Sequence, residues 1–252
     1  MKSRRLIVLF YVLAVHLFLF VIFWKPGFYH RINPFSNEHT VTYEIFYHNM
    51  LALQLRTDAV LQRRIELKLN PAPILFIGDS IIQGMCVSCI SKDAVNFGIG
   101  LDTTHGVLER ISQYQTLQQA RAVVLAIGLN DTRVRNNDEI LAGYRAILQR
   151  IPRHIPVIFS AVLPIAANPR WPGDTNDRIK ALNHAAKTLC ATRTGCHFVD
   201  YSKALATPHG RLAPDKHVGD GIHPNTDAYQ ALIAEFKFTL IQIGLINPEY
   251  IH

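Results

Sequence analysis

The chain has 252 residues, of which 49% are hydrophobic and 18% are charged; this excludes intrinsic disorder for most of its length and allows one sizeable α/β domain with a short appendage. The formal net charge is +7, but residues 1–69 carry nine basic and four acidic side chains, whereas residues 70–252 carry 17 and 15. Because the positive charge is concentrated near the N-terminus, we expect no nucleic-acid-binding surface on the main domain.

An uncharged apolar segment lies close to the N-terminus. Residues 6–24 contain no formal charge over 19 positions, and a helix of that length spans roughly 28 Å, about the thickness of a bilayer core. Three basic residues precede the segment and Lys25 follows it, so the positive-inside rule places the N-terminus in the cytoplasm. Residues 1–25 are therefore predicted to form a cytoplasmic stub and a single transmembrane anchor.

A cleaved signal peptide is the alternative interpretation of this segment. The apolar run is longer than the hydrophobic region of most signal peptides, and residues 24–28 (WKPGF) contain no small-x-small cleavage site. We therefore expect residues 26–252 to lie outside the cytoplasmic membrane. The natural setting is the periplasmic side of a bacterial inner membrane.

Residues 26–71 are predicted to combine a linker with a juxtamembrane helix. Residues 25–42 contain two prolines and no clear hydrophobic period, whereas residues 43–69 place apolar side chains at helical spacing with four basic side chains between them. Two interpretations of this helix stay open: contact with lipid headgroups, or packing on the domain that follows. Asn70-Pro71-Ala72-Pro73 ends the helix, and the main domain is predicted to cover residues 72–252.

Within the main domain, apolar runs of strand length alternate with helical patterns. Buried strands are predicted over residues 74–78, 94–98, 122–128, 157–163 and 197–200, and helices over residues 103–114, 137–151, 174–190 and 225–240. Continuous apolar strands separated by helices are typical of a parallel sheet with helices on both faces. The sequence therefore predicts a three-layer α/β/α domain with a parallel sheet of about five strands.

The four cysteines form two close pairs in the sequence, Cys86 with Cys89 and Cys190 with Cys196. An oxidising compartment favours disulfides, but four cysteines allow three pairings, and the spacing alone leaves all three open. A zinc site is the alternative, although the spacer between the second pair is long for a zinc knuckle. A CxxC redox pair would need a thioredoxin-like context.

Polar side chains follow several of the predicted strands. The first strand ends in Gly78-Asp79-Ser80, the third ends in Gly128-Leu129-Asn130-Asp131, and Asp220-Gly221-Ile222-His223-Pro224 precedes the last helix. Sites in parallel sheets form at the carboxyl ends of the strands. Each motif alone is an ordinary turn or helix cap. Together they supply a hydroxyl, an amide and a carboxylate/imidazole pair, which is the set that acyl transfer needs.

These motifs, in this order, resemble the SGNH (GDSL) hydrolase superfamily across roughly residues 72–245. A further block at residues 96–104 (NFGIGLDTT) is similar to that of platelet-activating-factor acetylhydrolase catalytic subunits and their bacterial relatives. An α/β-hydrolase elbow would need glycine two positions after Ser80, and that position holds Ile82. The resemblance implies an SGNH-type fold and a serine ester hydrolase that needs neither a metal nor another cofactor.

The resemblance also implies a role for each residue of a catalytic triad. Ser80 would be the nucleophile, His223 would be the general base and then the general acid, and Asp220 would orient the imidazole. His217 is interpreted as a loop histidine, because the spacing of the motifs singles out His223. Structural roles are expected for the neighbouring carboxylates Asp79, Asp102 and Asp131.

An oxyanion hole is implied as well. It would consist of the backbone N–H of Ser80, the side-chain amide of Asn130 and a backbone N–H at Leu101 or Gly100. The family pattern has glycine where this chain has Leu101. Leucine adopts a positive φ only at a cost, and its isobutyl group would narrow the acyl pocket.

The expected function is therefore that of a membrane-anchored, extracytoplasmic serine esterase that acts on acyl esters and prefers short acyl chains. Candidate substrates are small esters such as lysolipid-like molecules, and O-acetylated glycans of the cell envelope. One alternative is an O-acyltransferase, which would need a separate membrane partner to deliver acetyl groups. Another is a catalytically silent module that binds glycan or protein.

Overall fold

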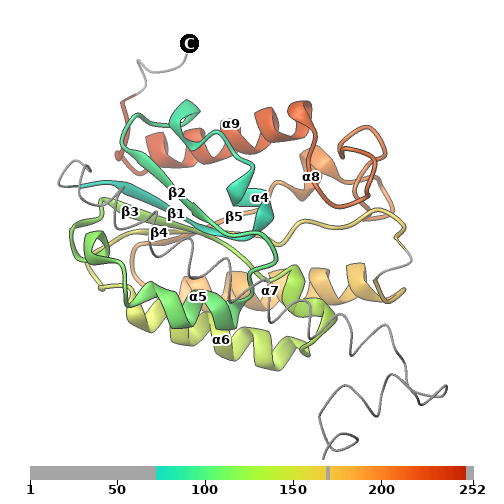
Figure 1. Cartoon of the computed structure of the whole chain (residues 1–252), viewed down its shortest axis with the longest axis horizontal. Helices are drawn as coiled ribbons and strands as arrows, with labels where there is room; N and C mark the ends of the chain where they lie inside the picture. The colour runs from blue at the N-terminus through green and yellow to red at the C-terminus, as the bar shows by residue number, and fades with distance from the viewer. Residues whose placement is uncertain (1–71, 169–170, 248–252) are drawn as a thin grey trace, which may run out of the picture. The chain divides into compact units, whose positions relative to one another are not determined.

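Figure 1 shows the computed structural model of the chain, which describes residues 72–168 and 171–247. Five strands form one sheet in the order β2-β1-β3-β4-β5, and every neighbouring pair is parallel. The predicted α/β class and the five-stranded parallel sheet are confirmed. The strands are β1 (Ile74–Gly78), β2 (Ala94–Gly98), β3 (Ala122–Ala126), β4 (Val157–Ser160) and β5 (Cys196–Val199).

Helices cover both faces of the sheet. In Figure 1, α5, α6 and α7 lie on one face, and α9 lies on the other with the short helices α4 and α8. The helices are α4 (Ser80–Gln83), α5 (Thr104–Ile111), α6 (Asn137–Arg150), α7 (Thr175–Ala191), α8 (Ser202–Leu205) and α9 (Thr226–Gln242). Single 3₁₀ turns occur at Val87–Cys89, Gln115–Gln119 and Asn130–Arg133.

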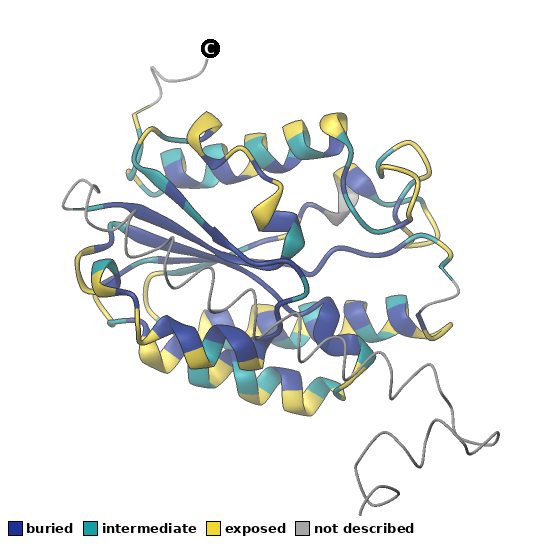
Figure 2. Ribbon diagram, in the orientation of Figure 1, coloured by how far each residue is buried: buried dark blue, intermediate teal, exposed yellow. Residues whose placement is uncertain are grey.

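The sheet is the centre of the hydrophobic core. Every residue of β1, β3 and β4 is buried, and the long helices turn one buried stripe toward them, as Figure 2 shows. Strands buried on both faces are expected to be continuously apolar, because neither set of alternating side chains reaches water. Phe76 on β1 packs edge-on against Phe236 of α9, which fastens that helix to the sheet.

Two predicted strands are shorter than expected. The third strand ends at Ala126 instead of residue 128, because Gly128 has a φ of 127°, which lies outside the strand region. The fourth ends at Ser160 instead of residue 163. Its partner β5 ends at Val199, whose carbonyl accepts the N–H of Ala161 (2.8 Å).

The cysteines form two local disulfides, Cys86–Cys89 and Cys190–Cys196. The first lies just before β2, at one edge of the sheet, and the second joins the end of α7 to β5 at the opposite edge. The four sulfurs are therefore not gathered into one zinc site. The sequence left three pairings open, and the structure has the one that joins neighbouring cysteines.

The predicted anchor over residues 6–24 and the linker and helix over residues 26–71 lie outside the described residues. Within residues 72–168 and 171–247, no helix is long and apolar enough to cross a membrane.

Candidate active site

The direction in which strands are added reverses at β1, because β2 lies on one side of it and β3 on the other. In open parallel sheets, the crevice outside the carboxyl ends at such a switch point is the usual ligand site. Ser80 follows β1 and Asn130 follows β3, separated from the strand ends by one and three residues. The topology therefore brings two of the predicted site residues to this crevice.

A tight turn places Ser80 at the first position of α4. Asp79 caps the helix, since its side chain accepts the N–H of Ile81 (3.0 Å). The turn needs the glycine that precedes it, because a Cβ on Gly78 would stand 2.3 Å from the carbonyl oxygen of Ala126. The Gly-Asp-Ser sequence thus folds into a strand-to-helix turn that presents the serine at the sheet edge.

Ser80, His223 and Asp220 are joined by two hydrogen bonds. Ser80 Oγ lies 2.9 Å from His223 Nε2, and His223 Nδ1 lies 2.5 Å from Asp220 Oδ2. The carboxylate can only accept at neutral pH, so Nδ1 carries the imidazole proton and Nε2 is left to accept the serine proton. The structure therefore brings the three predicted triad residues together, although 143 positions separate the serine from the histidine.

Asp220 is held as a carboxylate. Partial burial acts to raise its pKa, but hydrogen bonds from the His223 imidazole and from the backbone N–H groups of His223 and Ile222 outweigh it and lower the pKa to about 2. The group is therefore ionised at neutral pH. An ionised partner can stabilise an imidazolium, should His223 take up a proton.

Asn130 and the second sequence block also meet. Asn130 is 9% exposed, and its Nδ2 donates to the backbone carbonyl of Asp102 (3.0 Å). An amide nitrogen carries two hydrogens, so this bond leaves one for a substrate oxygen. Gly100 and Leu101 directly precede Asp102, and their backbone therefore lies beside the Asn130 amide.

Leu101 adopts the left-handed backbone conformation. Its φ is 67°, and no other non-glycine residue in the described part of the chain has a positive φ. It occupies the third position of a turn closed by the N–H of Asp102 and the carbonyl of Ile99 (3.1 Å). A positive φ at that position favours glycine, and leucine costs about 1–2 kcal/mol there. The chain thus keeps the backbone path that glycine would favour, in spite of the substitution.

A buried ion pair lies beneath this turn. Asp102 and Arg110 are 0% and 4% exposed, and their charged groups are 2.6 Å apart. The guanidinium also donates to the carbonyls of Phe97 (3.0 Å) and Gly78 (3.2 Å) and contacts the Tyr114 hydroxyl. Arg110 thereby ties the ends of β1 and β2 to the Leu101 turn. Sequence patterning missed this residue, because arginine is rarely buried, even where it stands, as here, three positions after the buried Val107 of α5.

The other carboxylates near the site also have structural partners. Asp131 is fully buried and accepts the Thr104 N–H (2.9 Å) and hydroxyl (2.6 Å), which joins α5 to the segment after β3. Burial raises the pKa of Asp131 to about 6, although the bonds from Thr104 oppose the shift. The structural roles expected for Asp79, Asp102 and Asp131 agree with these contacts.

Burial raises the pKa of Asp79 from 3.8 to about 7, against the opposing hydrogen bond from the Ile81 N–H. Between these two pH values, the carboxyl group of Asp79 is protonated in the folded state and ionised in the unfolded state. The contribution of the Asp79 carboxyl to the free energy of unfolding therefore falls as the pH rises from about 4 to about 7.

Asp79→Asn keeps the oxygen that caps α4 but cannot ionise. We expect the variant to be more stable than the wild type near pH 7.5, with a smaller difference near pH 5, in urea denaturation of both proteins. Asp215→Asn, at a side chain that is 72% exposed, is the matched control and should show no such pH-dependent difference. A constant difference between Asp79→Asn and the wild type across this range would contradict the titration.

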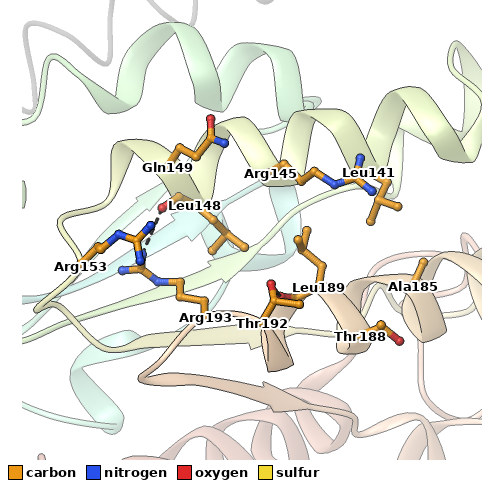
Figure 3. A pocket seen from close by; sticks show the side chains of 10 residues that line it. All are labelled: Leu141, Arg145, Leu148, Gln149, Arg153, Ala185, Thr188, Leu189, Thr192 and Arg193. Atoms are coloured by element: carbon orange, nitrogen blue, oxygen red, sulfur yellow. Dashed lines mark hydrogen bonds between the residues drawn. The ribbon is translucent and has the colours of Figure 1, made fainter.

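A cavity of about 630 Å³ lies between α6 and α7, and Figure 3 shows its lining. Arg193 on its wall donates to the carbonyls of Leu148, Pro152 and Ile155, and so caps the end of α6. This region precedes β4, at the end of the sheet opposite the carboxyl ends of the strands. The cavity is therefore separate from the site around Ser80.

The chain is similar to known acylhydrolases. The GDSL-like lipase/acylhydrolase family matches residues 76–231. Platelet-activating factor acetylhydrolase IB subunit alpha1 of Bos taurus is 25% identical over 147 residues, which cover 56% of this chain and 63% of that protein, just under two thirds of its length. The alpha2 subunit of Rattus norvegicus is 29% identical over 183 residues, covering 70% of this chain and 79% of that protein.

A solved structure from Streptococcus pneumoniae, described as a platelet activating factor, has the same architecture. It superposes with a TM-score of 0.69 at 26% identity and covers 81% of this chain and 100% of its own. The family match covers more than half of the chain and contains Ser80, Asn130, Asp220 and His223. The resemblance predicted from the sequence motifs is thus confirmed. The chain belongs to the GDSL-like lipase/acylhydrolase family.

Proposed function

We propose that this protein is a membrane-anchored, extracytoplasmic serine esterase that cleaves short-chain acyl esters through Ser80, His223 and Asp220. One observation carries the proposal: the continuous hydrogen-bonded series from Ser80 Oγ through the His223 imidazole to Asp220, at the switch point of the sheet. Serine is activated as a nucleophile when it is hydrogen-bonded to a base and a third group orients that base.

Each residue has a role in the proposed reaction. Ser80 Oγ attacks the ester carbonyl while His223 Nε2 takes the hydroxyl proton, and Asp220 stabilises the resulting imidazolium. The Ser80 N–H, the Asn130 amide and a backbone N–H at Gly100 or Leu101 meet the oxyanion. The intermediate collapses to an acyl-serine as His223 protonates the leaving alcohol. A water molecule, deprotonated by His223, then releases the carboxylic acid and restores Ser80.

The proposed location rests on the N-terminal segment and the disulfides. The 19 uncharged residues 6–24 are long enough for one membrane span, and the basic residues before them favour a cytoplasmic N-terminus. Two disulfides in one domain are typical of an oxidising compartment. We therefore place the catalytic domain on the periplasmic side of an inner membrane.

The preference for short acyl groups rests on two supports. The similar mammalian proteins are named acetylhydrolases, and Leu101 brings an isobutyl group to a turn beside the proposed oxyanion site. Small acetyl esters and O-acetylated envelope glycans are accordingly the proposed substrates.

A graded series of esters, from acetyl to long acyl chains, tests the proposal. The wild type should hydrolyse the acetyl ester without an acceptor, whereas an O-acyltransferase would turn over slowly until a sugar is added, and a binding module would not turn over. Leu101→Gly should extend hydrolysis to longer chains while changing the acetyl rate only modestly. An equal gain for every chain, on the order of 10²-fold in kcat, would contradict the pocket role, since it is the size expected for a recovered oxyanion donor.

A further inference from the structure

The loop that carries Asp220 and His223 is closed on itself. Residues 217 and 224 form an antiparallel bridge. The N–H of Val218 donates to the carbonyl of His223 (3.0 Å), and the N–H of Asn225 donates to the carbonyl of Lys216 (3.3 Å). The backbone between these contacts must therefore reverse direction over residues 219–222, where Asp220 lies.

The imidazole of His217 fills the inside of this reversal. Its Nδ1 accepts the backbone N–H of Gly219 (3.0 Å) and that of Gly221 (3.1 Å). Both glycines have positive φ values, 105° and 77°, so the side chain binds the two residues at which the backbone turns. An Nδ1 that accepts two hydrogen bonds carries no proton, so the neutral ring of His217 has its proton on Nε2.

Asp220 stands between the two glycines that His217 binds. Its carbonyl accepts Asn168 Nδ2 (2.8 Å), and the carbonyl of Gly221 accepts the N–H of Ala166 (2.8 Å). These bonds attach the outside of the loop to the segment after β4, while His217 holds the inside. The direction of the Asp220 carboxylate, and with it the bond to His223 Nδ1, follows from this backbone path.

We propose that His217 is a positioning residue for the acyl-transfer reaction: its unprotonated Nδ1 organises the Gly219-Asp220-Gly221 turn that directs Asp220 at His223. The inference rests on the proposed function. The two histidines of this loop need their proton on opposite ring nitrogens. His223 needs its proton on Nδ1 to bind Asp220, and His217 needs Nδ1 free of a proton to bind the turn.

Three substitutions in the full-length chain, purified in detergent micelles, separate this role from simple packing. His217→Asn places an amide oxygen close to the position of Nδ1, His217→Gln places its amide one bond farther out, and His217→Ala removes the acceptor. We expect kcat for the acetyl ester to fall about 10- to 100-fold in the Ala and Gln variants at nearly unchanged KM, because small misplacements of a catalytic group cost about that much. The Asn variant should stay within about threefold of the wild type.

His209→Ala, at an exposed histidine of a neighbouring loop, is the control and should match the wild type. Thermal unfolding of all variants shows whether a loss of activity comes from a loss of stability of the whole domain. Equal activity in all three His217 variants would overturn the proposal, as would an Asn variant no more active than the Gln variant. Should the Ala variant fail to fold, the comparison of Asn with Gln still decides.

A second measurement does not depend on activity. Nitrogen NMR spectra of ¹⁵N-histidine-labelled protein distinguish the two ring tautomers. We expect His217 protonated on Nε2 and His223 on Nδ1, with the His223 signature kept in the Asn variant and lost in the Ala variant. Protonation of His217 on Nδ1 would overturn the inference. Absence of Ser80-dependent hydrolysis in the wild type would instead count against the proposed function, because these spectra are read without substrate.

Discussion

Ser80→Ala is expected to lower kcat for ester hydrolysis by about 10⁴-fold to 10⁶-fold while leaving the melting temperature unchanged. The large effect follows from the loss of the one oxygen bonded to His223 Nε2. Ser80 lies at the first position of α4 and is only partly buried, and Asp79 supplies the helix cap, so removing the hydroxyl leaves the fold intact. Initial rates with the acetyl ester, together with circular dichroism melts, measure both quantities.

Ser88→Ala provides the matched control for this substitution. Ser88 is exposed and lies eight positions further along the chain, outside the proposed site. Its loss should change neither the rate nor the stability appreciably. Activity of the Ser80→Ala enzyme within about tenfold of the wild type would refute the serine mechanism, since that is far less than the loss of a nucleophile costs.

Arg110→Met is expected to lower the free energy of unfolding by about 3–5 kcal/mol. The substitution leaves Asp102 as a fully buried carboxylate without its cation, and it removes the donor that serves the carbonyls of Phe97 and Gly78. Methionine fills much of the same volume, so the effect reports the lost charge and hydrogen bonds. Urea denaturation gives the magnitude.

Glu109→Ala, the neighbouring position on α5, is the control for this prediction. Glu109 pairs with His105, and both side chains are more than half exposed. An exposed pair contributes less than about 1 kcal/mol. A loss of similar size in both variants would mean that the ion pair beneath the Leu101 turn contributes no more than a surface pair.

Much of the architecture followed from local sequence patterns. The strands are continuous apolar runs because both faces of a parallel sheet are covered, and that requirement is visible in any single strand. The strand ends were less predictable. The end of β4 depends on where its partner β5 stops, which is a property of another part of the chain.

Some residues of the candidate site were likewise predictable from the sequence, and others were not. Ser80, Asn130, Asp220 and His223 stand in short motifs whose order resembles a family, so their convergence was expected from the sequence. Their supports could not be foreseen. Thr104 pairs with Asp131, which is 27 positions away. Arg110 pairs with Asp102 close by in the sequence, but its bonds to the carbonyls of Phe97 and Gly78 form only in the fold.

His217 illustrates the limit of spacing arguments. Its distance from the family motif marks it as a loop histidine, and only the geometry of two backbone N–H groups reveals what the ring holds. Leu101 is the opposite case. The resemblance to the family indicated that a glycine is replaced by leucine, and the structure shows that the positive φ is kept.

The proposed mechanism requires His223 to activate Ser80 as the nucleophile. An alkyl fluorophosphonate reacts with activated serines and leaves a stable adduct, so mass spectrometry of the digested protein identifies the modified residue directly. We expect a single adduct, on Ser80, which disappears in both the Ser80→Ala and the His223→Ala chains. An adduct on another residue, or labelling of Ser80 that persists without His223, would contradict it.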